Sequence, residues 1–275
     1  MRAAAAARYG FVLWASARQQ WVYRTEMAAR SIQMVLFMGV FMALWSTAYS
    51  VSGRSDLQGF RLVDMVWYLA MTETITLSSS RIFVDIAEAV RSGDVAYMLA
   101  RPTGYPLFQV ASSLGNSLPR FLLNLITAST VVTLGMGRLP FLGGARAVGS
   151  LPGLAAFLVT AALALLLDAL VAVLIGLLAF WLEEVMPVFW IYQKLLFTVG
   201  GLFLPLEMFP QALQRIAAWL PFQFITYVPA RVFVAVEPLF LRRALLGQVI
   251  YVAVAAGLVT LVWRLAQRRL VVHGG

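Results

Sequence analysis

Residues 151–182 read LPGLAAFLVTAALALLLDALVAVLIGLLAFWL, and Asp168 is the one charged residue in the run. An α-helix needs about 20 apolar residues to cross the hydrocarbon core of a bilayer, so this stretch is longer than a single span requires. A helix with such an excess tilts or protrudes from the membrane. We therefore expect a spanning helix here.

Five further stretches are apolar enough to span in the same way. They are Ser31–Val51, Arg61–Ser79, Pro119–Met136, Val185–Leu204 and Leu245–Trp263. The whole chain is 61% hydrophobic and 12% charged, against roughly 25% charged in a soluble domain. The sequence therefore predicts a single all-α transmembrane domain over residues 1–275, a polytopic membrane protein with six spanning helices.

Two residue types that support much of protein chemistry are scarce. The chain has no cysteine, and its one histidine is His273. Thiolate nucleophiles, disulfides and zinc–thiolate sites are therefore excluded, and a metal site or a catalytic triad is not expected. An intramembrane enzyme needs a nucleophile and a base, or a metal set, at membrane depth, and the sequence does not favour one.

The excess of basic residues has a membrane explanation. Lys and Arg number 21 against 12 acidic residues, and the arginines lie mainly at the ends of apolar runs. There they would meet lipid headgroups and orient the chain with the more basic loops inside. This bias places both termini in the cytoplasm. We expect membrane lipids, and no nucleic acid, as partners.

Two segments outside the spans are expected to lie at the membrane surface or partly within the membrane. Residues 1–30 mix aromatic residues with arginine and glutamine, which predicts an interfacial N-terminal helix. Residues 205–236 are apolar but contain four prolines, which disfavour one continuous helix. We expect two short helices there, at roughly 210–220 and 224–235, that enter the membrane from the outer face and return.

Residues 81–106 form the long inner loop, and its first part is amphipathic. Apolar and charged positions separate onto different faces of a helix, with Ile82, Ile86 and Val90 on one and Asp85, Glu88 and Arg91 largely off it. Gly93 can end this helix, and Asp94 can cap the next one. Such a helix is either a docking surface or a solvated connector, and the residues alone leave both open.

Two acidic residues fall in the interior of predicted spans. Glu73 lies among Thr72, Thr74, Thr76 and Ser78, and Asp168 lies in the middle of its helix. A carboxylate at bilayer depth is costly unless it is paired or protonated, so each should face protein or water. Each is either part of a transport pathway or a partner in an interhelical hydrogen bond, and for Asp168 we favour the hydrogen bond.

Two motifs resemble a known family. The pattern I-x3-I-x6-G-x5-L-x-R-P (Ile82, Ile86, Gly93, Leu99, Arg101, Pro102) is similar to the loop after the second membrane helix of type-2 ABC-transporter permeases. The segment GGLFLPLEMFPQALQRIAAWLPFQFITYVPARVF (200–233) resembles their re-entrant outer hairpin. The opening WVYRTEM (21–27) and the closing RRLVVHGG (268–275) are similar to one six-helix bacterial subfamily.

The resemblance implies a permease of the bacterial cytoplasmic (inner) membrane, most often an exporter, that pairs with a second, identical or similar permease. Separate ABC ATPase subunits would bind ATP and Mg, since the chain has no G-x4-G-K-[ST] phosphate-binding loop. The implied coupling contacts to the ATPase are Ile82, Phe83, Asp85, Ile86, Glu88, Arg91, Gly93 and Asp94, with Glu183 and Glu184 as a second contact. The alternative is an autonomous secondary transporter or channel that uses Glu73 and Asp168.

Overall fold

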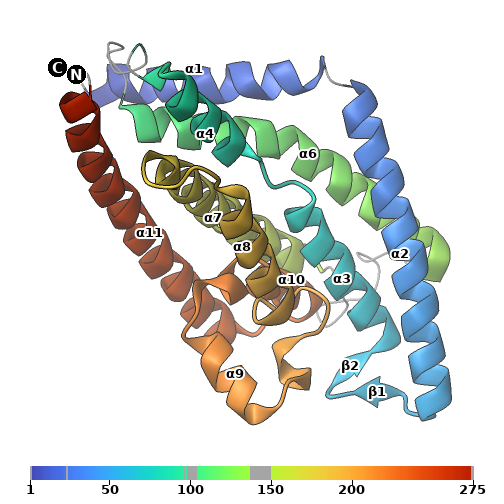
Figure 1. Ribbon diagram of the computed structural model, residues 1–275. Coiled ribbons are helices and arrows are strands. Elements are labelled where there is room, and N and C mark those ends of the chain that lie inside the picture. Colours follow the sequence, from blue (N-terminus) through green and yellow to red (C-terminus); the bar gives the residue numbers. More distant parts are fainter. Residues whose placement is uncertain (1, 23, 96, 98–103, 137–149, 274–275) are drawn as a thin grey trace.

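The computed structural model describes residues 2–22, 24–95, 97, 104–136 and 150–273, and most of them are helical (Figure 1). The α-helices are α1 (Arg2–Gln20), α2 (Arg24–Ser52), α3 (Leu62–Thr76), α4 (Ile82–Ser92), α6 (Tyr105–Met136), α7 (Leu151–Leu177), α8 (Met186–Thr198), α9 (Gln211–Ala218), α10 (Tyr227–Val234) and α11 (Pro238–His273). The 3-10 helices are η2 (Leu178–Phe180), η3 (Leu206–Met208) and η4 (Pro221–Phe224). Strands β1 (Asp56–Leu57) and β2 (Phe60–Arg61) form one short antiparallel pair. The predicted all-α class is confirmed.

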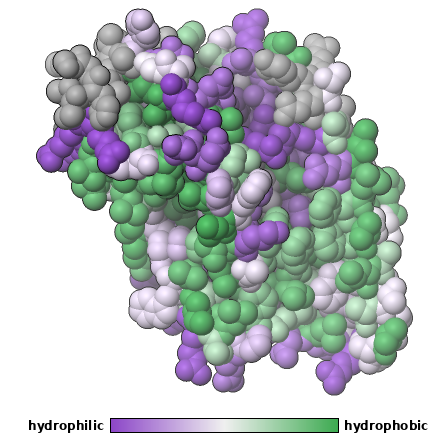
Figure 2. Space-filling model, in the orientation of Figure 1, coloured by the Kyte–Doolittle hydropathy of each residue, from purple (hydrophilic) through white to green (hydrophobic). Residues whose placement is uncertain are grey.

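The molecule has two distinct ends (Figure 1). We call the end with α1, α4 and the last turns of α11 the α1 end, and the end with β1, β2 and α9 the hairpin end. On the face drawn in Figure 2, hydrophilic side chains gather towards both ends, and hydrophobic ones cover most of the surface between them. Polar ends on either side of an apolar band are what a bilayer requires of a protein that crosses it.

Within the described part of the chain, four helices are long and apolar enough to cross a membrane. They are Ala29–Ser52 in α2, Tyr105–Met136 in α6, Leu151–Phe180 in α7 with η2, and Pro238–Arg269 in α11. The other two predicted spans, Arg61–Ser79 and Val185–Leu204, contain shorter helices: α3 has 15 residues and α8 has 13. At 1.5 Å per residue these are about 22 and about 20 Å long, less than the bilayer core of about 30 Å. The count of six spans stays a prediction.

Helix α8 ends at Thr198, just before Gly200 and Gly201. Gly201 has φ +75°, in the left-handed region that glycine adopts without strain. The chain turns there, so residues beyond Thr198 leave the helix axis that the prediction extended to Leu204.

The predicted start of the third span, at Pro119, is wrong. Helix α6 begins at Tyr105, and Pro119 lies inside it. A proline within a helix removes one backbone donor, which made position 119 look like a boundary. The first half of α6 is held by α1, which packs along it. Residues 105–118 are therefore helix rather than loop.

The contact between α1 and α6 is close and polar. Gln20 donates through Nε2 to Asn116 Oδ1 at 2.9 Å, and the hydroxyls of Ser16 and Ser112 lie 3.1 Å apart. Gly115 permits the approach, because a Cβ there would lie 2.4 Å from the carbonyl oxygen of Leu13. Helix α1 ends at Gln20 and α2 begins at Arg24, so the segment predicted as one helix over 1–30 includes the start of a second helix, and its interfacial position stays a prediction.

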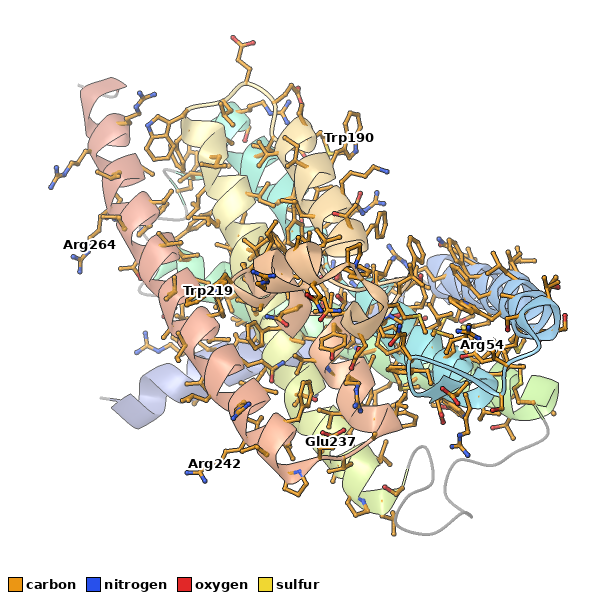
Figure 3. The ribbon with its side chains drawn as sticks, turned by 90° about the horizontal axis from the view of Figure 1, so that it is seen from below. Arg54, Trp190, Trp219, Glu237, Arg242 and Arg264 are labelled. Carbon is orange, nitrogen blue, oxygen red and sulfur yellow. The ribbon has the colours of Figure 1, made fainter. Side chains whose placement is uncertain are left out.

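Helix α7 is the centre of the molecule. It packs against α4, α6, α10 and α11, and Phe157, Ala161 and Val173 on it are fully buried. This explains why its sequence is apolar on every side, since a helix surrounded by others has no solvated face. Viewed from the hairpin end, α11 lies on one flank of the molecule and α2 on the other (Figure 3).

The proline-rich segment 205–236 forms two short helices, α9 and α10, as its sequence predicted. Helix α10 packs against α3 and α7. The ring of Phe233 lies 5.5 Å from that of Trp67 in α3 and 5.5 Å from that of Phe157 in α7. The segment therefore belongs to the packed body of the protein at its hairpin end, and its entry into a membrane stays a prediction.

Candidate functional site

Helix α4 is fastened to the body of the protein by its apolar face. Ile82, Phe83 and Ile86 are buried, and the ring of Phe83 stacks on that of Phe189 in α8 at 4.2 Å. Ile86 packs directly against Gly176 in α7. A Cβ at position 176 would lie only 2.8 Å from the Ile86 Cβ, so a side chain there would collide with Ile86. Because the chain's own helices cover these three side chains, they anchor α4, and a direct ATPase contact for them stays a prediction.

The ends of α4 follow the sequence signals. Gly93 ends the helix with φ +80°, a left-handed conformation that disfavours side-chain-bearing residues. Asp85 lies in the first turn and Arg91 in the last, where each charge complements the helix dipole. Asp94 accepts a hydrogen bond from the Ser92 hydroxyl at 2.8 Å. Leu99, Arg101 and Pro102 of the quoted motif lie outside the described residues.

The opposite face of α4 is charged and exposed. It carries Asp85, Glu88 and Arg91, and Arg91 Nη1 lies 3.2 Å from Glu184 Oε1. Glu183, next to this pair, is also exposed. The structure thus joins the two predicted contact regions into one charged surface at the α1 end.

Burial by the neighbouring helices raises the pKa of the Asp85 carboxyl, and the negative charge of Glu88 raises it further. The proximity of these like charges makes the exposed face of α4 acidic around its first turns. A cationic partner surface would relieve this repulsion.

A polar cavity of about 200 Å³ lies beside α4. Its lining comes from α2, α3, α8 and the connection between α3 and α4. The lining residues are Arg30, Gln33, Phe37, Glu73, Thr76, Leu77, Ser79, Ser80, Arg81, Phe189, Gln193, Phe197 and Phe203. Glu73 is the one carboxylate among them.

Glu73 is 3% exposed, and among the described residues its carboxylate makes no hydrogen bond or ion pair. The surrounding hydroxyls do not supply one. Thr74 donates to the carbonyl of Ala70 at 2.7 Å, and Thr76 donates to that of Thr72 at 3.0 Å. Thr72 donates to the carbonyls of Leu69 and Leu202, so the hydroxyls beside Glu73 are used by backbone carbonyls and none of them bonds its carboxylate.

Asp168 has a different environment. The Tyr192 hydroxyl in α8 donates to Asp168 Oδ1 at 2.6 Å, which ties α7 to α8. A small cavity of about 30 Å³ adjoins the carboxylate and shares Thr76 and Gln193 with the larger one. The hydrogen bond is the interhelical partner that the packing interpretation of Asp168 requires.

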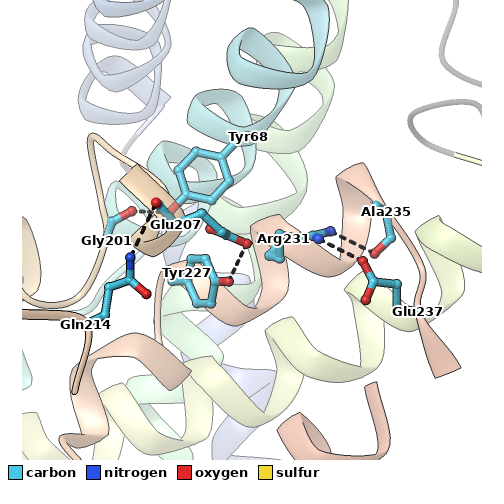
Figure 4. A network of polar contacts seen from close by, with 8 residues as sticks. All are labelled: Tyr68, Gly201, Glu207, Gln214, Tyr227, Arg231, Ala235 and Glu237. Carbon is cyan, nitrogen blue, oxygen red and sulfur yellow. Dashed lines mark hydrogen bonds and ion pairs between the residues drawn. The ribbon is translucent and has the colours of Figure 1, made fainter. Parts of the chain in front are cut away.

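A polar network at the hairpin end had no signal in the sequence (Figure 4). Arg231 in α10 donates through Nε to Glu207 Oε1 and through Nη2 to Glu237 Oε1, both at 2.8 Å. The Tyr227 hydroxyl donates to the same Glu207 oxygen at 2.8 Å, and Tyr68 in α3 donates to the Gly201 carbonyl. These bonds lock η3 and α10 to α3. The charges were visible in the sequence, but nothing in it paired them.

The sequence matches a known protein family over most of its length. The model of the family described as "ABC-2 family transporter protein" matches residues 34–274. No curated protein matches the sequence. The matched range includes α4, Glu73, Asp168 and the segment with α9 and α10, whereas two residues of the cavity lining, Arg30 and Gln33, precede it.

Proposed function

Because this chain belongs to the ABC-2 family of transporter proteins, and is thus a multi-pass permease component of an ABC transporter, we propose that it exports its substrate as one half of a permease dimer. Separate ABC ATPase subunits dock on the exposed face of α4 and power the export. The family membership fixes the class of protein, and the placement of α4 supports the docking site.

The observation that carries the docking proposal is the division of α4 into two faces. Phe83 and Ile86 hold the helix to α7 and α8, while Asp85, Glu88 and Arg91 remain exposed. A helix fixed on one face and charged on the other transmits a push to the helices beneath it. ATP binding that moves the ATPase subunits would thereby move α7 and α8.

The same arrangement supports an orientation in the bacterial inner membrane. We place the α1 end, with α4 and both chain termini, in the cytoplasm, where ATP is available. The arginines at positions 264, 268 and 269, in the last turns of α11, then lie on the inner side. This agrees with the preference of cytoplasmic loops for basic residues.

We assign Glu73 and its cavity to the transport pathway and Asp168 to helix packing. A buried carboxylate without a partner costs stability, so its presence needs a functional reason. The second permease of the dimer would cover exposed apolar side chains such as Leu246 and Val249 of α11.

The test is recovery of the ATPase with tagged, detergent-solubilised chain. We compare wild type with Glu88→Gln/Arg91→Gln on α4 and with a matched pair at the hairpin end, Arg54→Gln/Asp56→Asn. Each pair removes one acid and one base, so the net charge is unchanged. We expect the α4 pair to lower ATPase recovery about tenfold, equivalent to about 1.4 kcal/mol, and the control pair to leave it unaltered.

Two results would count against the proposal. Equal recovery with both pairs would remove α4 as the docking site. Wild-type chain that is folded but brings no ATPase would favour the autonomous transporter instead, with Glu73 as its ionisable group.

A further inference from the structure

The polar cavity is lined by one carboxylate, Glu73, and by two guanidinium groups, Arg30 and Arg81. The Glu73 carboxylate is 3% exposed and, among the described residues, without a hydrogen bond or ion pair. A buried anion in low dielectric needs a cation or a proton beside it. The amide, hydroxyl and aromatic groups of the lining do not neutralise it, and no arginine of the lining is paired with it in the described part of the chain. A ligand with a hydrogen-bonding cation would neutralise it.

The residues that lead into α4 also line the cavity. They are Ser79, Ser80 and Arg81, and Arg81 immediately precedes the first residue of the helix. The guanidinium of Arg81 is exposed and makes no hydrogen bond or ion pair within the described part of the chain, whereas Arg30, which also lines the cavity, donates to the Leu77 carbonyl at 3.3 Å. A guanidinium next to a helix N-terminus favours an anionic group.

The size of the cavity limits what can bind. Its volume of about 200 Å³ is below the range of roughly 300–1,000 Å³ typical of pockets that enclose a drug-sized molecule. It can enclose a small polar group while the rest of the ligand remains outside. The ligand is therefore a molecule with a compact polar head.

The surfaces beside the cavity are apolar and exposed. Leu36 of α2 is 64% exposed and Ile191 of α8 is 62% exposed, next to cavity-lining residues on the same helices. Trp190 also points away from the bundle (Figure 3). In a membrane these side chains meet lipid tails, so an apolar tail attached to the bound head group would have a favourable place to lie.

We propose that the cavity is the head-group site for an amphiphilic substrate whose polar head carries an ammonium group next to an anionic group, as phosphoethanolamine does. The ammonium binds Glu73 and the anion binds Arg81, with the tail along α2 and α8. This names the substrate class of the proposed exporter and rests on that proposed function. Because Arg81 immediately precedes α4, a head group bound to both Glu73 and Arg81 would connect the transport pathway to the docking helix.

The test measures binding to the purified full-length chain in a non-ionic detergent. The probes are lauroyl lysophosphatidylethanolamine, lauroyl lysophosphatidylglycerol, which has the same tail and phosphate but no ammonium, and dodecylammonium, which has no anion. Binding is followed by tryptophan fluorescence and by the rise in unfolding temperature that a ligand of the folded state produces.

We expect wild type to bind the ethanolamine lipid about tenfold more tightly than the glycerol lipid. Glu73→Gln should abolish this preference and weaken dodecylammonium, leaving the glycerol lipid unaffected. Arg81→Gln should remove the advantage of the ethanolamine lipid over dodecylammonium. The control is Asp56→Asn, an exposed acid at the hairpin end and outside the cavity, which should bind all three as wild type does.

Equal wild-type affinities for the ethanolamine and glycerol lipids would overturn the proposal, and this comparison needs no variant to fold. A preference that survives Glu73→Gln would also overturn it. The assay requires no ATPase, so its outcome is separate from the docking test. Binding without ATPase recovery would leave the site in an autonomous carrier, and ATPase recovery without the lipid preference would remove the substrate class alone.

Discussion

Gly176 of α7 and Ile86 of α4 fit together so closely that a Cβ at position 176 would lie 2.8 Å from the Cβ of Ile86. Ile86 is fully buried at this contact, and Phe83 beside it is stacked on Phe189 of α8. The position of the docking helix thus depends on the absence of a side chain at one residue of the central helix.

Gly176→Ala should therefore push α4 away from α7. Overpacking of this kind costs about 1–3 kcal/mol, although alanine is the better helix former by about 1 kcal/mol. We expect a lower unfolding temperature in detergent and weaker ATPase recovery. The matched control is Gly257→Ala in α11, where a Cβ would meet nothing within 4 Å and only the helix-forming gain applies. Equal behaviour of the two variants would contradict the close fit.

The pKa of Asp85 predicts a dependence of stability on pH. Burial raises this pKa, and Glu88 raises it further, so the folded protein binds the proton more tightly than the unfolded chain does. The free energy of unfolding therefore falls as the pH rises above the ordinary Asp value of about 3.9 and through the raised value. Asp85→Asn should remove this loss.

Unfolding temperatures of wild type and Asp85→Asn, measured across that range of pH, check the sign. The variant should be the more stable at neutral pH, and its advantage should disappear in acid. Glu88→Gln should recover part of the difference, because it removes the repulsion but not the burial. A wild-type advantage that grows with pH would show that the Asp85 charge is stabilised rather than penalised.

Structural features that depend on residues close together in the sequence were predicted correctly. Helix α4 and its end at Gly93 follow from apolar spacing and one glycine, and the short helices α9 and α10 follow from prolines. The course of α6 through Pro119 was missed because its support comes from α1, through pairs such as Ser16 and Ser112 that lie 96 residues apart.

The two membrane acids show the same limit for the site. In the sequence, Glu73 and Asp168 are both carboxylates in the interior of predicted spans, and only the hydroxyl residues beside Glu73 set them apart. In the structure, the packing of α8 distinguishes them, since it brings Tyr192 to Asp168 and a cavity to Glu73. The predicted lengths of α3 and α8 were too great, because the turns that follow these helices are as apolar as the helices themselves. Apolar composition therefore did not show where each helix ends.

The ion pairs of Arg231 should stabilise the hairpin end. Arg231 is 17% exposed as a side chain and contacts both Glu207 and Glu237 at 2.8 Å. Arg231→Gln leaves Glu207 partly buried without its cation, and one of its oxygens, Oε2, already lacks a hydrogen-bond partner among the described residues. Breaking a buried pair costs about 3–5 kcal/mol, and the partial exposure here reduces the expected loss to about 1–3 kcal/mol.

Thermal unfolding of the variant in detergent measures this loss, and Arg242→Gln is the control, since Arg242 points outward at the start of α11 (Figure 3). The double variant Arg231→Gln/Glu207→Gln should lose less than the sum of the two single variants, because neither charge is then left alone. Strictly additive losses would mean that the two residues do not interact.

The packing of α1 on α6 can be tested by a disulfide, because the chain has no cysteine of its own. The hydroxyl oxygens of Ser16 and Ser112 lie 3.1 Å apart, which places the two Cβ atoms near the separation a disulfide needs. Ser16→Cys/Ser112→Cys should cross-link under mild oxidation, as seen by loss of reaction with a maleimide polymer on a gel. The control pair is Ser16→Cys/Ser113→Cys, since residue 113 faces another side of α6 and should stay reduced.

Adding Gly115→Leu to the cross-linking pair should prevent the bond. Its Cβ alone would lie 2.4 Å from the Leu13 carbonyl and 2.7 Å from the Ser16 Cβ, so α1 must move away from α6. Cross-linking that is equal in all three proteins would show that α1 is not held in this position. Cross-linking confined to the first pair would establish that the N-terminal helix is part of the packed transmembrane domain, fixed along the first half of α6 rather than lying free on the lipid surface.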